Sequence, residues 1–155
     1  MAVLSESQFL ADRLRRICDG DPWYGDSVFK ILEGVTAKQA SARPIPNAHT
    51  IWEIVTHVTC CCVVDERRLQ GAFAREPEDG NWWPQPGKSE SEWKADLAAL
   101  KQAIVNLSHA TQELSEAGYE QSLMKTAHTF REQTHEALEH IVYHSAQIAI
   151  LKKTF

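Results

Sequence analysis

Two histidines four residues apart, His140 and His144, lie in an apolar stretch near the end of the 155-residue chain. The i, i+4 spacing places both imidazoles on one face of a helix, where they can ligate a single divalent metal ion. A third nitrogen ligand is offered by His57, which lies in another apolar, helix-periodic run over residues 50–58. Three imidazoles from two helices leave coordination positions open for water or substrate, which is typical of a catalytic metal site.

The histidine pair alone does not establish a metal site. The same spacing occurs in histidines that are buried and hydrogen-bonded inside a helical bundle. His57 is what favours the metal interpretation over this alternative. Surface positions rather than ligand roles are expected for the four other histidines, which are His49, His109, His128 and His135.

Spacing excludes two other metal motifs. A ferritin-like di-iron bundle requires two Glu-x-x-His motifs, and only Glu132 with His135 provides one. The zinc-protease motif HExxH is absent around Glu136, because His140 comes one position too late.

Residues one helical turn from the histidines have chemistry that a metal site could use. Glu53 and Glu136 precede His57 and His140 by four residues. Each could accept a hydrogen bond from a ligand or act as a general base, and a solvated helix face explains both positions equally. Cys61 follows His57 by one turn and could be a fourth ligand or a redox-sensitive thiol, but a buried apolar role is favoured.

Capping boxes, in which Ser or Thr is followed three residues later by Glu or Gln, predict where the helices begin. They occur at Ser5 with Gln8, Thr36 with Gln39, Thr50 with Glu53, Ser89 with Glu92, and Thr129 with Glu132. Glycine and proline residues indicate where the helices end. We therefore expect helices over about 5–18, 24–34, 50–70, 89–117 and 129–153, with one short turn after residue 36.

No alternating strand pattern and no internal repeat competes with these helices, so the predicted class is all-α. The four later helices suggest a four-helix bundle, with the helix over 5–18 as an extra, flanking element. The Gly- and Pro-rich segment 71–88 predicts a long crossover that lets the helices before and after it run parallel. Within it, Trp82-Trp83-Pro84 could form a lid over a substrate or anchor the loop to the bundle.

Composition excludes several classes of protein. With 43% apolar and 24% charged residues, the chain has the composition of an ordinary soluble globular protein, and its length suits a single domain over 1–155. No apolar run approaches the roughly 18 residues of a membrane-spanning helix, and the N-terminus lacks the apolar region of a signal peptide. We expect a cytoplasmic protein with no membrane partner.

Cysteine usage and charge agree with that expectation. The cysteines are Cys18 and the consecutive Cys60, Cys61 and Cys62, and neighbouring residues on a helix cannot build a disulfide framework. Reduced thiols fit the cytosol. The net charge is −5 and the basic residues are scattered, so a nucleic-acid partner is not expected.

Several segments together resemble the DinB-like (YfiT-like) superfamily of metal-dependent enzymes. The resemblance runs from about residue 22 onward, and its most specific part is the His140–Lys153 segment. Its other parts are Pro22-Trp23-Tyr24-Gly25, Leu32-Glu33-Gly34-Val35-Thr36, residues 42–58 with Arg43-Pro44-Ile45-Pro46 and Trp52, and the helix start Ser89-Glu90-Ser91-Glu92-Trp93.

The resemblance implies a four-helix bundle with a long crossover between helices two and three, and one divalent metal ion, often zinc or nickel, held by three histidines. Carried over position by position, these are His57, His140 and His144. Tyr24 stands where similar sequences often have histidine, which makes it a further candidate catalytic group beside Glu53 and Glu136. The run of three cysteines likewise replaces an often aromatic or acidic stretch, so the substrate is left open.

Characterised relatives in that superfamily transfer or isomerise substrates with the help of low-molecular-weight thiols. The expected function is therefore that of a hydrolase or thiol-dependent transferase, in which the metal activates water or a thiol for attack on a small-molecule substrate. The resemblance also points to a homodimer. The alternative is a non-catalytic, metal- or small-molecule-binding bundle, such as a stress-related one, in which the metal only stiffens the core.

Overall fold

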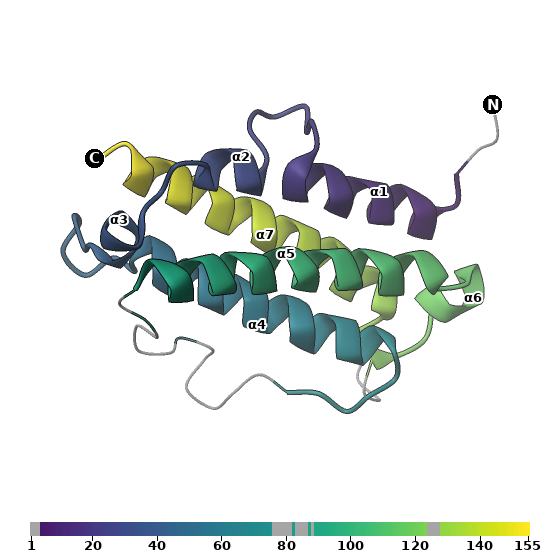
Figure 1. Ribbon diagram of the computed structural model, residues 1–155. Helices are drawn as coiled ribbons and strands as arrows, with labels where there is room; N and C mark the ends of the chain where they lie inside the picture. The colour runs from purple at the N-terminus through teal and green to yellow at the C-terminus, as the bar shows by residue number, and fades with distance from the viewer. Residues whose placement is uncertain (1–3, 76–81, 83–86, 88, 124–127) are drawn as a thin grey trace.

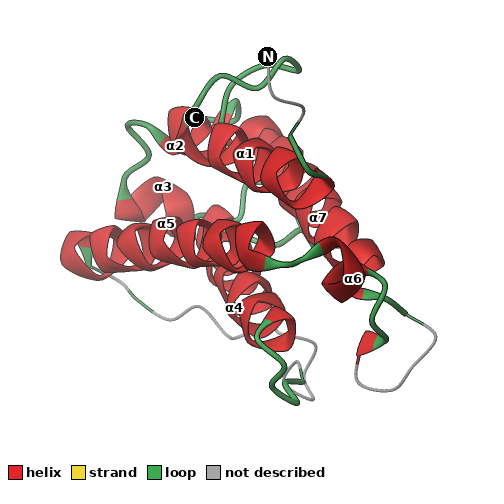
Figure 2. Ribbon diagram, turned by 90° about the vertical axis from the view of Figure 1, so that its right-hand side faces the viewer, coloured by secondary structure: helices red, strands yellow, loops and turns green. Residues whose placement is uncertain are grey.

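The computed structural model describes residues 4–75, 82, 87, 89–123 and 128–155. Its helices are α1 (Glu6–Asp19), α2 (Val28–Leu32), α3 (Ala37–Ser41), α4 (Ile51–Leu69), α5 (Glu90–Glu113), α6 (Glu116–Tyr119) and α7 (Phe130–Lys152). Figure 2 shows helices and loops but no strand in these ranges, where the nearest feature is an isolated bridge between Ser122 and Thr129. The predicted all-α class is confirmed.

Five helices begin at the predicted capping boxes. In α1, α3, α4, α5 and α7 the cap hydroxyl accepts a hydrogen bond from the third helical N–H, and the Gln or Glu side chain there accepts one from the cap N–H. Each box satisfies two backbone donors that a helix start otherwise leaves without partners, so local sequence fixes these positions.

The long helices α1, α4, α5 and α7 pack side by side (Figure 1). α5 contacts α1 and α4, and α7 contacts α4 and α1. In Figure 1, α4 and α5 run in the same direction and α1 and α7 run in the opposite one. The parallel α4 and α5 agree with the predicted long crossover between them.

The fourth long helix of the bundle is α1, not the predicted helix over 24–34. The expected helix over 24–34 is only five residues long, whereas α1 packs against α5 and α7 rather than flanking the bundle. Leu10, Leu14 and Ile17 form one fully buried face of α1. Around α2, Gly25 and Gly34 have positive φ angles of 140° and 77°, which interrupt helical geometry on both sides.

The expected helix over 89–117 is also divided. α5 ends at Glu113, and Ser115 accepts a hydrogen bond from the N–H of Gly118 to start the four-residue α6. A second cap within the stretch therefore ends one helix and begins another.

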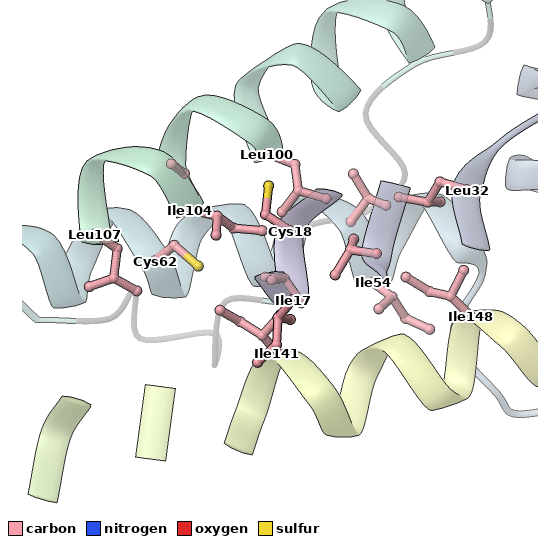
Figure 3. Packing of buried hydrophobic residues seen from close by; sticks show 14 of the residues in the cluster. Ile17, Cys18, Leu32, Ile54, Cys62, Leu100, Ile104, Leu107, Ile141 and Ile148 are labelled. Atoms are coloured by element: carbon pink, nitrogen blue, oxygen red, sulfur yellow. The ribbon is translucent and has the colours of Figure 1, made fainter. Parts of the chain in front are cut away.

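The core lies between the four long helices. Figure 3 shows apolar side chains from each of them pointing into one space, including Ile17, Cys18, Ile54, Cys62, Leu100, Ile104, Leu107, Ile141 and Ile148. None of the helices in the described part of the chain combines the length and apolar character needed to cross a bilayer.

Two buried tryptophans join α4 to α5. The rings of Trp52 and Trp93 lie 5.2 Å apart, and their indole N–H groups donate to Asp96 at 2.6 Å and to the carbonyl of Val35 at 2.7 Å. Gly87, at the end of the crossover, lies so close to Trp52 that an added Cβ would be 2.6 Å from its ring. The crossover is therefore fixed to the core just before α5 begins.

Candidate metal centre

Three histidine side chains converge where α4 meets α7. The Nε2 atom of His140 lies 3.1 Å from Nε2 of His57 and 3.0 Å from Nε2 of His144. The candidate ligand atoms of the three lie within 4.8 Å of one another, and no other such group of His, Cys, Asp or Glu occurs among the described residues. The structure thus brings together the three residues singled out by spacing.

The two distances from Nε2 of His140 fit one shared divalent ion. Two nitrogens bound at about 2.05 Å from one ion lie about 2.9 Å apart at a right angle and about 3.3 Å apart at a tetrahedral angle. Both observed distances fall within that interval. Nε2 of His140 has either one hydrogen or one lone pair for two neighbouring nitrogens, so a cation satisfies the cluster better than hydrogen bonds within it.

The tautomer of His144 suits metal binding. Its Nδ1 lies 2.7 Å from Oε1 of Gln147, and an amide oxygen can only accept a hydrogen bond. Nδ1 therefore carries the proton, and the lone pair on Nε2 faces the other two histidines. This is the outer hydrogen bond that ordinarily orients a metal-ligating histidine.

The electrostatic environment favours the neutral forms of His140 and His144. Burial, together with the neighbouring His144 and His57, lowers the pKa of His140 from 6.5 to about 4. Burial also lowers the pKa of His144; the Gln147 hydrogen bond opposes this shift and His49 reinforces it. Neutral imidazole is the form that binds metal, so little proton competition is expected at neutral pH.

A cleft of about 350 Å³ opens beside the cluster. His57 and His140 form part of its wall, and the rest is lined by Cys61, Asp65, Gln133, Glu136 and Ala137. Gln133 donates to Asp65 at 2.9 Å. The carboxylate of Glu136 lies 3.2 Å from Nε2 of His128. A small molecule in this cleft would touch two of the three histidines and two carboxylates.

The candidate catalytic residues are placed very differently. Glu136 lies in the cleft. Glu53 instead closes the capping box of α4 and pairs with Arg43 at 2.6 Å and with His49 at 3.3 Å. Tyr24 does not line this cleft. Burial raises the pKa of Tyr24, and the nearby Arg13 partly opposes that rise. Only Glu136 is positioned to meet a substrate next to the histidines.

The three consecutive cysteines separate into two groups. Cys60 and Cys62 are buried, and burial raises the pKa of Cys62 well above its ordinary value. Cys61 is partly exposed in the cleft, and its Sγ lies 3.9 Å from Nε2 of His57. Cys61 is therefore not fully buried, unlike Cys60 and Cys62.

Trp82 of the crossover covers the cluster. Its ring is parallel to His57 at a centroid distance of 3.9 Å and to His49 at 3.5 Å. Two rings this close and parallel to one indole must lie on its opposite faces, because on the same face they would overlap. Trp82 is also 5.7 Å from the ring of His144. Its neighbours Trp83 and Pro84, from the same predicted motif, lie outside the described residues.

Two residues contribute to the site in ways that spacing did not predict, His49 and Gln147. His49 is exposed, as expected, but its ring also stacks on Trp82. Because His49 precedes the first residue of α4, no helical periodicity relates it to His57. His49 and Gln147 also line a pocket of about 320 Å³ with Ile45, Asn47, Ala48, Ile54, Ile150 and Leu151. His109 is exposed, and His135 pairs with Glu6 on the surface, as expected.

Comparison with known proteins identifies the family of this chain. A family model described as the DinB superfamily matches residues 25–148, which include all three histidines of the cluster. No curated protein and no solved structure gave a significant match. Because the family match covers most of the chain, the protein belongs to the DinB superfamily.

Proposed function

We propose that this protein is a metal-dependent enzyme that binds one zinc or nickel ion through His57, His140 and His144. Its substrate would be a small molecule, and the reaction either hydrolysis or transfer to a low-molecular-weight thiol. The observation that carries the proposal is the convergence of three Nε2 atoms at the wall of an open cleft. A purely nitrogen donor set suits zinc and nickel better than magnesium or calcium.

The metal would supply positive charge. A divalent ion held by three neutral imidazoles keeps its full charge and lowers the pKa of a water or thiol ligand toward neutrality.

The residues around the cluster would orient it and handle protons. Gln147 holds His144 with its lone pair toward the cluster, and Trp82 shields one face of His57 from water. Glu136 can accept a proton from a nucleophile in the cleft, since it lines the same wall as His140. His128, 3.2 Å from that carboxylate, can receive the proton in turn.

A structural role for the metal is the alternative, and the position of the core argues against it. The apolar cluster between the four long helices includes Trp52 and Trp93, which join α4 to α5 without any help from the histidines. A bundle of this size buries enough apolar surface to fold without a metal. The proposed metal ion is therefore better explained by a catalytic role than by a structural one.

The test is a screen for thiol conjugation and hydrolysis, run on metal-loaded and chelated protein. We expect chelation to abolish turnover while the helical circular dichroism signal and a cooperative melt remain, and the metal to restore turnover. His140→Ala should behave like the chelated protein, whereas the control His135→Ala, on the exposed side of α7, should behave like the wild type. Unfolding of the chelated protein would instead favour the structural role.

A further inference from the structure

We propose that Cys61 provides a sulfur ligand to the ion bound by the three histidines and occupies the cleft side of the site until a substrate thiol replaces it. This inference rests on the metal site proposed above. It adds a fourth ligand and favours thiol transfer over hydrolysis as the chemistry of the site.

Cys61 lies close to the histidine cluster. Cys61 follows His57 by four residues in α4, so its side chain lies on the same helical face one turn further along. Its Sγ is 3.9 Å from Nε2 of His57. A nitrogen and a sulfur bound to one tetrahedral zinc ion are about 3.5 Å apart, so the thiol needs to move only about 0.4 Å closer to reach ligand distance.

Cys61 also lies on the side from which a ligand can approach the cluster. Cys61, His57 and His140 line the same cleft, whereas Trp82 is stacked against the ring of His57. A fourth ligand entering through the cleft would enter along a wall that includes Cys61. The thiol therefore stands beside the coordination position that the three histidines leave open.

Cys61 differs from the two neighbouring cysteines in its exposure. Cys60 and Cys62 are buried in the protein, and only Cys61 of the three reaches the cleft. Successive residues of a helix point about 100° apart, so a run of three cysteines necessarily presents one of them differently. Cys60 is thus a matched internal control.

Coordination needs no oxidant or reductant. The S–H proton of Cys61 passes to solvent, and the sulfur–metal bond replaces a bond to water. A thiolate lowers the net charge of the site, so the resting protein would acidify a bound water less than a site with three imidazoles alone. An incoming substrate thiolate replaces the Cys61 thiolate, which is a ligand of equal strength. Water would have to replace the same thiolate although it is a weaker ligand. The sulfur also favours thiophilic ions over magnesium or manganese.

The test is the absorption spectrum of the full-length protein loaded with cobalt(II), purified without added thiols. Wild type should show a sulfur-to-cobalt charge-transfer band in the near ultraviolet. Cys61→Ser should lose the band while still binding one cobalt ion per chain, and Cys60→Ser should keep both band and ion. A wild-type protein that binds cobalt without the band would overturn the inference and leave the three-histidine site standing. A protein that binds no cobalt would overturn both.

Alkylation of the wild-type protein gives an answer that does not depend on a variant folding. Zinc-loaded and metal-free protein are treated with iodoacetamide, and the modification of each cysteine is read by peptide mass spectrometry. Cys61 should be alkylated readily in the metal-free protein and be protected by zinc. Equal alkylation of Cys61 in both states would contradict its coordination.

Discussion

At the scale of single residues, the site depends on groups that aim the histidines as much as on the histidines themselves. The three imidazoles could be named from spacing, because i, i+4 on one helix and an apolar helical context for the third are local properties of the sequence. Gln147 and Trp82 could not be assigned their roles in this way. Each acts through a contact that only tertiary packing creates, and Trp82 lies 25 residues from His57 along the chain.

Gln147→Leu tests the orientation of His144. Leucine removes the acceptor for Nδ1–H, so the imidazole is free to adopt the other tautomer. We expect zinc affinity to fall by about 10- to 100-fold with little change in the unfolding curve, measured by competition with a chromophoric chelator. Gln147→Glu retains an acceptor and should bind zinc at least as tightly as wild type. Equal affinities for the leucine variant and wild type would show that this hydrogen bond is unimportant.

The lowered pKa of His140 predicts the acid stability of the metal-free protein. The pKa of His140 is about 4 in the folded protein and 6.5 in the unfolded chain. Between pH 4 and pH 6.5 the unfolded chain therefore binds more protons than the folded one. The free energy of unfolding should therefore be independent of the titration of His140 above pH 6.5 and should decrease as the pH falls from 6.5 toward 4. Thermal melts across this range measure it. His140→Asn should have a shallower decrease, and identical slopes for the two proteins would be inconsistent with the shifted pKa.

At the scale of helices, local sequence patterns predicted where the helices begin but not which helices pack against each other. All five capping boxes lie where the sequence places them, since a box involves only four residues. Which helix completes the bundle was predicted wrongly, because an apolar face shows that a helix is buried but not against which neighbour. α1 and α2 both have such faces, and only the three-dimensional packing gives α1 the larger role.

Thr50→Ala tests how firmly α4 is anchored about two turns before His57. The cap hydroxyl accepts from the N–H of Glu53, and Glu53 in turn accepts from the N–H of Thr50. Alanine removes the first bond, and we expect a loss of about 1 kcal/mol in the free energy of unfolding, measured with urea. Thr50→Ser keeps a hydroxyl and should lose much less. If serine and alanine were equally destabilising, the cap would not be the cause.

At the scale of the whole molecule, an exposed apolar surface near α1 supports the expected homodimer. Leu4, Phe9 and Trp23 border a groove of about 450 Å³, and Trp23 is 87% exposed. A surface of this kind is often an interface, and a two-fold symmetric one pairs the same patch on both copies. We propose that two chains associate here. Light scattering should give twice the 17.5 kDa chain mass.

The variant Phe9→Ser with Trp23→Ser is expected to be monomeric and to retain its metal, because both residues lie away from the histidine cluster. Phe73→Ser, which changes another exposed aromatic side chain, serves as the control and should remain a dimer. A clean 17.5 kDa particle for the wild type at micromolar concentration would contradict the proposal.

The whole account depends on one divalent ion at the junction of α4 and α7. Elemental analysis of the purified protein tests this most directly, with His57→Ala, His140→Ala and His144→Ala combined in one variant and His109→Ala as the control. We predict one zinc or nickel ion per chain in the wild type and the control, and none in the triple variant with its helical signal preserved. The same metal content in the triple variant as in the wild type would contradict the assignment of the site.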